Sequence, residues 1–262
     1  MSFHFRSLRS SSSGNCLMLW TQTTRILLDC GIKTYSGCVG VLREHTEKLD
    51  GVLVSHAHGD HICRHSLRAL AECGAPIHCH RDIITQIHGK HSNDGDWVAP
   101  LRGFCDDPFE IGDLTIQPVQ VPHAPGYLTF GFVVWCGEGR DRRKAVICTD
   151  FNHYGSLIGQ LADSDFVFIE ANHDPDLLRK HPNFASRFHL SNPKAAQLLC
   201  EARTNGGFAP QAVMLGHLSH QRNTDPLAIA AIRDTFQAQG LDLEFRLEVA
   251  PRDEPSIEIC IE

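Results

Sequence analysis

An apolar run ends in three histidines and one aspartate within the stretch Val52-Leu53-Val54-Ser55-His56-Ala57-His58-Gly59-Asp60-His61. Its β-branched and leucine residues, bounded by polar and glycine positions, predict a short buried strand. We expect a helix to follow over residues 62–73. The polar side chains therefore lie where a strand of an α/β layer ends, and such folds place their chemistry at that edge.

The spacing of these side chains suits metal coordination, because imidazole nitrogens and carboxylate oxygens bind divalent cations at about 2.0–2.2 Å. His56 and His58 lie two apart on an extended segment, so they project to the same side and can share one ion. Asp60 and His61 lie at the turn into the helix and can hold a second ion, about 3.5–4 Å from the first. The alternative is a solvated histidine-rich loop in a chain with 17 histidines.

Length and composition are those of an ordinary soluble globular protein. The 262 residues are 42% hydrophobic and 21% charged, and we expect a single domain over residues 1–262. No apolar run approaches the length of a membrane span, and the first residues lack a secretory signal, so we expect a cytoplasmic protein with no membrane partner. The net charge of −7 argues against broad nonspecific binding to nucleic acid, but not against a local basic groove.

The 11 cysteines are scattered along the chain, and no two of them form a C-x-x-C pair. This usage predicts reduced, mostly buried thiols. A cysteine-based zinc site is therefore not expected.

Three later segments repeat the pattern of a strand that ends in a polar side chain. They are residues 119–121 before His123, residues 145–149 before Asp150, and residues 211–216 before His217. Taken alone, His123 also fits a loop histidine with a structural hydrogen bond, and Asp150 also fits a helix cap.

In combination these motifs resemble the metallo-β-lactamase-fold hydrolases. Residues 56–61 are similar to the HxHxDH signature of that family, and Asp29-Cys30-Gly31 is similar to its Asp-x-Gly, whose aspartate braces the metal loop. The resemblance covers nearly the whole chain and implies an α/β fold, the four-layer αββα sandwich, with the metal site at one edge. It implies a first ion bound by His56, His58 and His123, a second bound by Asp60, His61 and His217, and Asp150 bridging the two.

The implied ligands are all nitrogen or oxygen donors, and they accommodate two divalent ions of Zn, Mn or Fe. A hydroxide that bridges the ions would attack phosphorus in line, while the ions stabilise the developing charge. Asp60 or Asp150 would orient this nucleophile. His189 is the third candidate catalytic residue, through contact with the substrate phosphate.

Several segments are similar to the YycJ-like (WalJ-like) branch of this superfamily. They are Ser-Ser-Ser-Gly-Asn at residues 11–15, Glu-Ala-Asn-His-Asp at 170–174, and the repeated His-Leu-Ser at 189–191 and 217–219. The branch resemblance implies phosphodiester hydrolysis by a 5′-to-3′ DNA exonuclease, with nucleic acid or another phosphodiester as partner. The candidate substrate contacts are Ser13, Asn15, Asn172, His173, His189, Ser191, Ser219 and Asn223.

Three polar segments have local interpretations beside the functional ones. Residues 10–16 also fit a flexible serine-rich loop, and residues 88–96 are expected to form a surface loop. Residues 178–192 are expected to be a basic loop that could form a lid. Ser191 or Asn192 is expected to cap a helix over residues 193–203.

Two departures from the branch leave the substrate open. Phe188 precedes His189-Leu190-Ser191 where the family usually has glycine, and Arg222-Asn223 stands where it often has paired asparagines. The alternatives are a phosphodiesterase for a small cyclic phosphate and a thioester or lactam hydrolase that uses the same ions. A non-enzymatic metal or redox sensor on this fold is a further alternative of another class.

Overall fold

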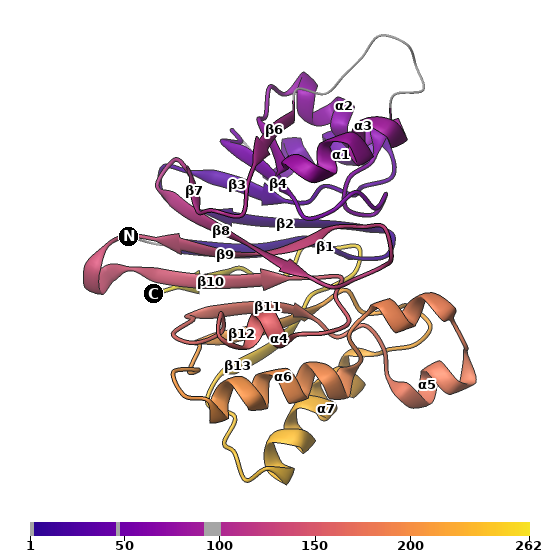
Figure 1. Ribbon diagram of the computed structural model, residues 1–262, viewed down its shortest axis with the longest axis vertical. Helices are drawn as coiled ribbons and strands as arrows, with labels where there is room; N and C mark the ends of the chain where they lie inside the picture. Colours follow the sequence, from indigo (N-terminus) through magenta and orange to yellow (C-terminus); the bar gives the residue numbers. More distant parts are fainter. Residues whose placement is uncertain (1–2, 46–47, 92–100) are drawn as a thin grey trace.

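The computed structural model describes residues 3–45, 48–91 and 101–262. Two seven-stranded sheets lie face to face, and helices cover the outer face of each (Figure 1). In Figure 1, α1 (Tyr35–His45), α2 (Arg64–Glu72) and α3 (Arg81–His91) lie above the sheets, while α6 (Asn192–Thr204) and α7 (Asp225–Ala238) lie below them. The predicted four-layer αββα sandwich is confirmed.

The first sheet contains most of the N-terminal half of the chain together with the last strand. Its strands β1, β2 and β3 form an antiparallel meander, and β3 to β6 run parallel to one another. In spatial order it consists of β14 (Ile259–Ile261), β1 (Phe3–Ser11), β2 (Gly14–Trp20), β3 (Arg25–Leu28), β4 (Gly51–Val54), β5 (Ile77–His80) and β6 (Leu101–Phe104).

The second sheet contains the later strands. Strands β10 to β13 are parallel, and β9 is antiparallel to both of its neighbours, so β8 runs in the same direction as β10. In spatial order it consists of β13 (Arg246–Val249), β12 (Ala212–Gly216), β11 (Phe166–Glu170), β10 (Arg143–Cys148), β9 (Thr129–Cys136), β8 (Leu114–Val121) and β7 (Phe109–Ile111).

Two helices, α5 (Pro175–Lys180) and α7 (Asp225–Ala238), begin where a capping side chain and a proline favour them. Asp174 accepts hydrogen bonds from two backbone amides at the start of α5, and the Thr224 side chain accepts one at the start of α7. Both helices also carry proline in the first turn. The helices are α1 (Tyr35–His45), α2 (Arg64–Glu72), α3 (Arg81–His91), α4 (Gly155–Ile158), α5 (Pro175–Lys180), α6 (Asn192–Thr204) and α7 (Asp225–Ala238), with 3-10 turns η1 (Gly139–Asp141) and η2 (Phe184–Phe188).

Alternation of side chains along the strands builds three apolar layers. In β11, Phe166 and Phe168 pack between the two sheets, whereas Val167 and Ile169 pack against α4, α6 and α7. In β4, Leu53 faces the inter-sheet core, and its neighbours face the layer that holds α1, α2 and α3. A strand buried on both faces needs a continuous apolar sequence, which explains the all-apolar runs.

Two segments differ from the sequence expectations. Ser10 and Ser11 belong to β1 and pair with β2, so the serine-rich segment is mostly a hairpin and not a flexible loop. Helix α3 continues through His88 to His91, so the first part of the expected surface loop is helical. Residues 92–96 of that loop lie outside the described residues.

The segments around the metal-binding stretch and the expected lid also need correction. Helix α2 begins at Arg64 and not at residue 62, because Ile62 forms a parallel bridge with Cys30. The expected loop over residues 178–192 contains the end of α5 and the turn η2, where the Asn183 side chain accepts a hydrogen bond from the backbone N–H of Ala185. The helix after it begins at Asn192 and not at residue 193, and Ser191 occupies the N-cap position without a capping hydrogen bond from its side chain.

All 11 cysteines are free thiols, and seven of them are buried, as the cysteine usage predicted. Within the described ranges, no helix is long and apolar enough to cross a membrane.

Candidate metal centre

The site lies at the edge where strands of both sheets end. Five strands that run in the same direction within their sheets end at this site: β3 and β4 from the first sheet, and β8, β10 and β12 from the second. The residues that follow their carboxyl ends are Asp29, His56, His123, Asp150 and His217. The apolar runs that end in polar residues therefore meet at one edge of the sandwich, as strand polarity requires.

The loop after β4 is held in place by Asp29 at the end of β3. The Asp29 carboxylate accepts hydrogen bonds from the backbone N–H of Ser55 at 2.8 Å and from its hydroxyl at 2.7 Å. The same carboxylate lies 2.7 Å from Nδ1 of His61, both side chains being buried. Such a contact fixes the orientation of the imidazole and turns its Nε2 toward Asp150 Oδ2, 3.1 Å away.

Gly31 packs its backbone directly against this loop. A Cβ at residue 31 would lie 1.7 Å from the carbonyl oxygen of Asp60, so the Asp29-Cys30-Gly31 motif needs glycine for close backbone approach.

We expect Gly31→Ala to lower the free energy of unfolding by about 1–3 kcal/mol and to weaken metal binding, measured by urea unfolding and metal content. Gly59→Ala, in the same loop, should behave like wild type, because a Cβ at residue 59 would meet no atom within 4 Å. Equal effects of the two substitutions would contradict this interpretation.

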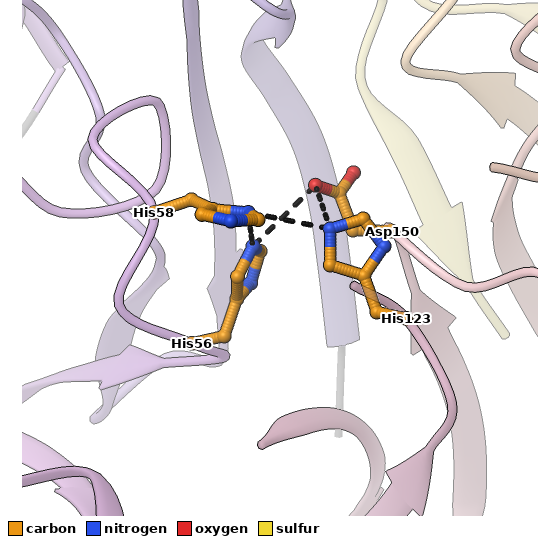
Figure 2. Close-up of side chains that lie close together, drawn as sticks. All are labelled: His56, His58, His123 and Asp150. Carbon is orange, nitrogen blue, oxygen red and sulfur yellow. Dashed lines mark hydrogen bonds and ion pairs between the residues drawn. The ribbon is translucent and has the colours of Figure 1, made fainter. Parts of the chain in front are cut away.

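The first cluster consists of three histidines and one aspartate (Figure 2). His56 Nε2 lies 2.8 Å from His58 Nδ1, which in turn lies 3.2 Å from His123 Nε2. Asp150 Oδ2 lies 3.5 Å from His56 Nε2 and 3.6 Å from His123 Nε2. Figure 2 shows the four side chains pointing toward a common centre. His123 Nδ1 lies 2.9 Å from the carbonyl oxygen of Phe188, which orients its ring.

The second cluster shares Asp150 with the first and adds Asp60, His61 and His217. Asp150 Oδ2 lies 3.1 Å from His61 Nε2, and Oδ1 lies 2.9 Å from His217 Nδ1. Asp60 Oδ2 lies 3.7 Å from His217 Nε2 and 3.8 Å from His61 Nε2. In each cluster the ligand atoms lie within 4.8 Å of one another. The structure thus groups the seven predicted ligands as the family pattern implies, and their assignment to two ions remains a proposal.

The donor set fits divalent cations. Asp150 Oδ1 and His217 Nε2 are buried and make no hydrogen bond of good geometry among the described residues, although Asp150 Oδ1 forms an ion pair with His217 Nδ1 at 2.9 Å. Buried polar atoms are normally paired, and a cation would satisfy both atoms. Asp29, Asp150 and His217 all have positive φ angles, of 61°, 57° and 53°. Non-glycine residues rarely adopt this conformation, and it concentrates at functional sites.

The two clusters differ in protonation. Burial lowers the pKa of His58 to about 4, and burial and the neighbouring His61 lower the pKa of His56 well below its usual range. Burial opposes protonation of His61 and His217 as well, but Asp150 and the other nearby carboxylates raise the pKa of both histidines well above the usual range. Without metal, the first cluster is therefore largely neutral at its histidines, while His61 and His217 hold protons.

This difference predicts how metal affinity depends on pH. A cation at the second cluster must displace protons from His61 and His217, so its apparent affinity should rise about tenfold per pH unit for each proton displaced near neutral pH. Affinity at the first cluster should change little over the same range, because His56 and His58 are already neutral. Competition between the protein and a chelator for zinc at several pH values measures both. Equal pH dependence for the two ions would contradict the prediction.

Sequence patterns missed two buried residues that hold the site together. Glu170, the last residue of β11, accepts hydrogen bonds from the backbone N–H groups of Phe151 and Leu190, at 2.8 and 2.9 Å. Its Oε2 lies 3.1 Å from His189 Nδ1 and 3.2 Å from His217 Nδ1. With Asp150 these three residues form a further group whose geometry could hold a cation. The available signal was a carboxylate at the end of an entirely buried strand.

Ser10 is the second missed residue. Its hydroxyl accepts a hydrogen bond of 2.8 Å from the backbone N–H of His217, which has the positive φ noted above. The bond joins β1 of the first sheet to the end of β12 in the second, across 207 residues of sequence. No sequence pattern links two residues so far apart in the chain, so this hydrogen bond could not be predicted.

A cavity of about 450 Å³ opens beside both clusters. Of the predicted substrate contacts, Asn172, His189 and Ser219 line it, together with the predicted ligands Asp60 and Asp150. His189 is protonated more readily than a free histidine, because Glu170 and Asp150 outweigh burial and raise its pKa. Residues that line the cavity without having been predicted include Ser12, Asn183, Ser186 and Arg222.

The other predicted substrate contacts lie outside the lining of the cavity. Asn15 is buried behind the site, where its amide donates to the carbonyl oxygen of Asp60 at 3.2 Å and lies 3.0 Å from His61 Nε2. Asn223 is buried, and its amide donates to Ala171. Ser13 is exposed in the β1–β2 turn, and His173 and Ser191 pair with each other in a short bridge. Asn15 and Asn223 thus make structural contacts inside the protein rather than facing the cavity.

Comparison with known proteins agrees with this geometry. The family model described as Beta-lactamase superfamily domain matches residues 24–218. A protein of Streptococcus pneumoniae named exodeoxyribonuclease WalJ is 26% identical over 94% of this chain and 93% of its own length. Exodeoxyribonuclease YycJ of Bacillus anthracis is 23% identical over 97% of this chain and 96% of its own length.

The fold is shared with solved structures as well. The metallo-beta-lactamase fold protein YhfI from Bacillus subtilis superposes with a TM-score of 0.73 at 18% identity. The match covers 99% of both chains. At this identity the likeness supports the architecture and not a substrate.

Proposed function

The chain belongs to the beta-lactamase superfamily of metal-dependent hydrolases. We propose that it hydrolyses phosphodiester bonds with two divalent metal ions and acts as a 5′-to-3′ DNA exonuclease. One observation carries the proposal. Asp150 is shared by two ligand clusters, each of which adds three further nitrogen or oxygen donors. Two metal ions at such a shared carboxylate suit in-line displacement at phosphorus.

His56, His58 and His123 would hold one ion, Asp60, His61 and His217 the other, and Asp150 both. Zn, Mn or Fe is compatible with these donors. When bound, the ions would supply Lewis-acid stabilisation of the negative charge that develops on the phosphate. The buried carboxylates Asp29 and Glu170 would keep the histidines in their orientations.

The chain's own residues would position the substrate. Protonated His189 lines the cavity and can donate a hydrogen bond to a phosphate oxygen. Arg222 brings a permanent positive charge to the same cavity, and its hydrogen bonds go to the His181 carbonyl, the Ser219 hydroxyl and the Gln221 amide oxygen. Asp60 also lines the cavity and can orient the attacking water.

A polynucleotide substrate is favoured by the names of the two relatives, both exodeoxyribonucleases, which match this chain over almost their full length. The net charge of −7 does not oppose it, because the cations that matter are those at the cavity.

The test is hydrolysis of linear duplex DNA labelled at the 5′ end or at the 3′ end, with Mn²⁺ or Zn²⁺ added. Immediate release of labelled mononucleotide from the 5′-labelled strand is the expected result. Release of the 3′ label first would reverse the proposed polarity. Cleavage of a cyclic mononucleotide but not of DNA would replace the exonuclease with a small-molecule phosphodiesterase, and cleavage of neither would refute phosphodiester hydrolysis.

A further inference from the structure

An exposed aromatic side chain lies beside the cavity on the turn η2. Phe184 is 71% exposed and is one of three large hydrophobic side chains exposed among the described residues. The Arg187 guanidinium lies over its ring, 3.5 Å from the centroid, and also over the ring of Phe188 at 4.5 Å. The two rings meet edge to face at 6.0 Å. We refer to Phe184, Arg187 and Phe188 as the Phe184 platform.

The Phe184 platform adjoins the proposed metal site directly. Asn183 and Ala185, the chain neighbours of Phe184, both line the cavity, and so does Phe188. The carbonyl oxygen of Phe188 lies 2.9 Å from Nδ1 of the candidate ligand His123. The turn η2 therefore places the exposed Phe184 ring four residues from Phe188, whose carbonyl oxygen contacts the candidate metal ligand His123.

The charge beside the ring is uncompensated. Across the described ranges, no carboxylate forms an ion pair with Arg187, and none forms one with Arg222 on the cavity wall. The guanidinium covers one side of the Phe184 ring, while most of the side chain remains open to solvent. A planar aromatic group together with a free cation suits a ligand that has both a flat π face and a phosphate.

We infer that the Phe184 platform stacks a nucleobase of the single strand whose phosphodiester enters the metal cavity, and so selects polynucleotides over small phosphodiesters. The inference rests on the proposed function and deepens it. Base–aromatic stacking is tolerant of sequence, because every base has a π face, and basic side chains beside it follow the phosphate backbone. This arrangement suits an exonuclease, which must accept each successive nucleotide whatever its base.

The test compares single-stranded oligonucleotides in which one nucleotide at a time lacks its base. For wild-type protein with Mn²⁺, removal of the stacked base should lower kcat/KM by about 5- to 100-fold at one position near the cleaved end. In Phe184→Ala this penalty should fall toward onefold, and Phe184→Trp should restore it. Ile257→Ala, which truncates an exposed side chain away from the cavity, should keep the wild-type penalty.

Arg187→Lys separates stacking from charge. Lysine keeps the positive charge but lacks the planar guanidinium, so the base-dependent penalty should shrink while binding remains salt-dependent.

The outcomes are distinguishable. If wild-type protein degrades DNA but tolerates base removal at every position, or if Phe184→Ala keeps the full penalty, the platform is refuted and the nuclease stands. If wild-type protein cleaves no oligonucleotide, the proposed function and the platform both fail.

Discussion

Asp150→Asn is expected to lower phosphodiester hydrolysis by at least about 10²–10³-fold and to reduce the metal content of the purified protein. Asp150 Oδ2 lies within 3.6 Å of Nε2 atoms from both clusters, so the substitution removes the one charge that both sites share. Burial opposes ionisation, but His217 and His61 hold the pKa of Asp150 well below its usual range, so the carboxylate is charged at neutral pH.

Asparagine is the informative replacement because it preserves the shape of the side chain. It also tolerates the left-handed backbone of Asp150, where φ is 57°. The matched control is Asp163→Asn, at an exposed aspartate with a similar φ of 54° that lies outside the cavity lining. Metal analysis and thermal unfolding of both variants separate loss of charge from loss of fold. Retention of wild-type rate and two bound ions by Asp150→Asn would contradict the bridging role.

The ends of the buried strands could be predicted from the sequence because the pattern that marks each end lies within a few residues. A strand buried on both faces must be apolar throughout, so an abrupt change to histidine or aspartate after it is conspicuous. This is the pattern at Val54, Cys148 and Gly216, each the last residue of a strand in the structure. Strand β8, which ends at Val121, instead alternates apolar residues with Thr115, Gln117 and Gln120. Parallel strand direction then brings the following ligands to one edge. The sequence could therefore predict that the candidate ligands His56, His123, Asp150 and His217 lie together at one edge.

The two residues that sequence patterns missed owe their roles to contacts with residues far away in the chain. Glu170 accepts from one amide 19 residues before it and another 20 residues after it, and Ser10 acts on His217 from another sheet. Contacts that are distant in sequence also explain why some predicted substrate contacts do not line the cavity. Asn15 and Asn223 are polar and lie next to family motifs, yet they are buried and bonded to the backbone. Sequence shows that a side chain can form hydrogen bonds, but the fold decides whether it faces substrate or protein.

Glu170→Gln is expected to lower activity or metal affinity by about 10- to 100-fold, as for other residues that orient metal ligands. Burial would raise the pKa of Glu170, but His189 and then His217 outweigh it and lower this pKa to about 2, so the buried group is charged. Its charge in turn helps to raise the pKa of His189 and His217. Glutamine keeps an oxygen for the amides of Phe151 and Leu190 but removes that charge.

The distinguishing readout is therefore the pH dependence of metal binding. With the charge gone, the pKa of His217 falls, fewer protons compete with a cation at neutral pH, and the rise of affinity with pH at the second cluster should become shallower. A residue that served packing alone would lower stability without changing this slope. The control is Glu201→Gln, which removes a charge on α6 that binds Tyr154 and Gln197 away from the cavity. If Glu170→Gln kept the wild-type slope, Glu170 would not act through the histidines.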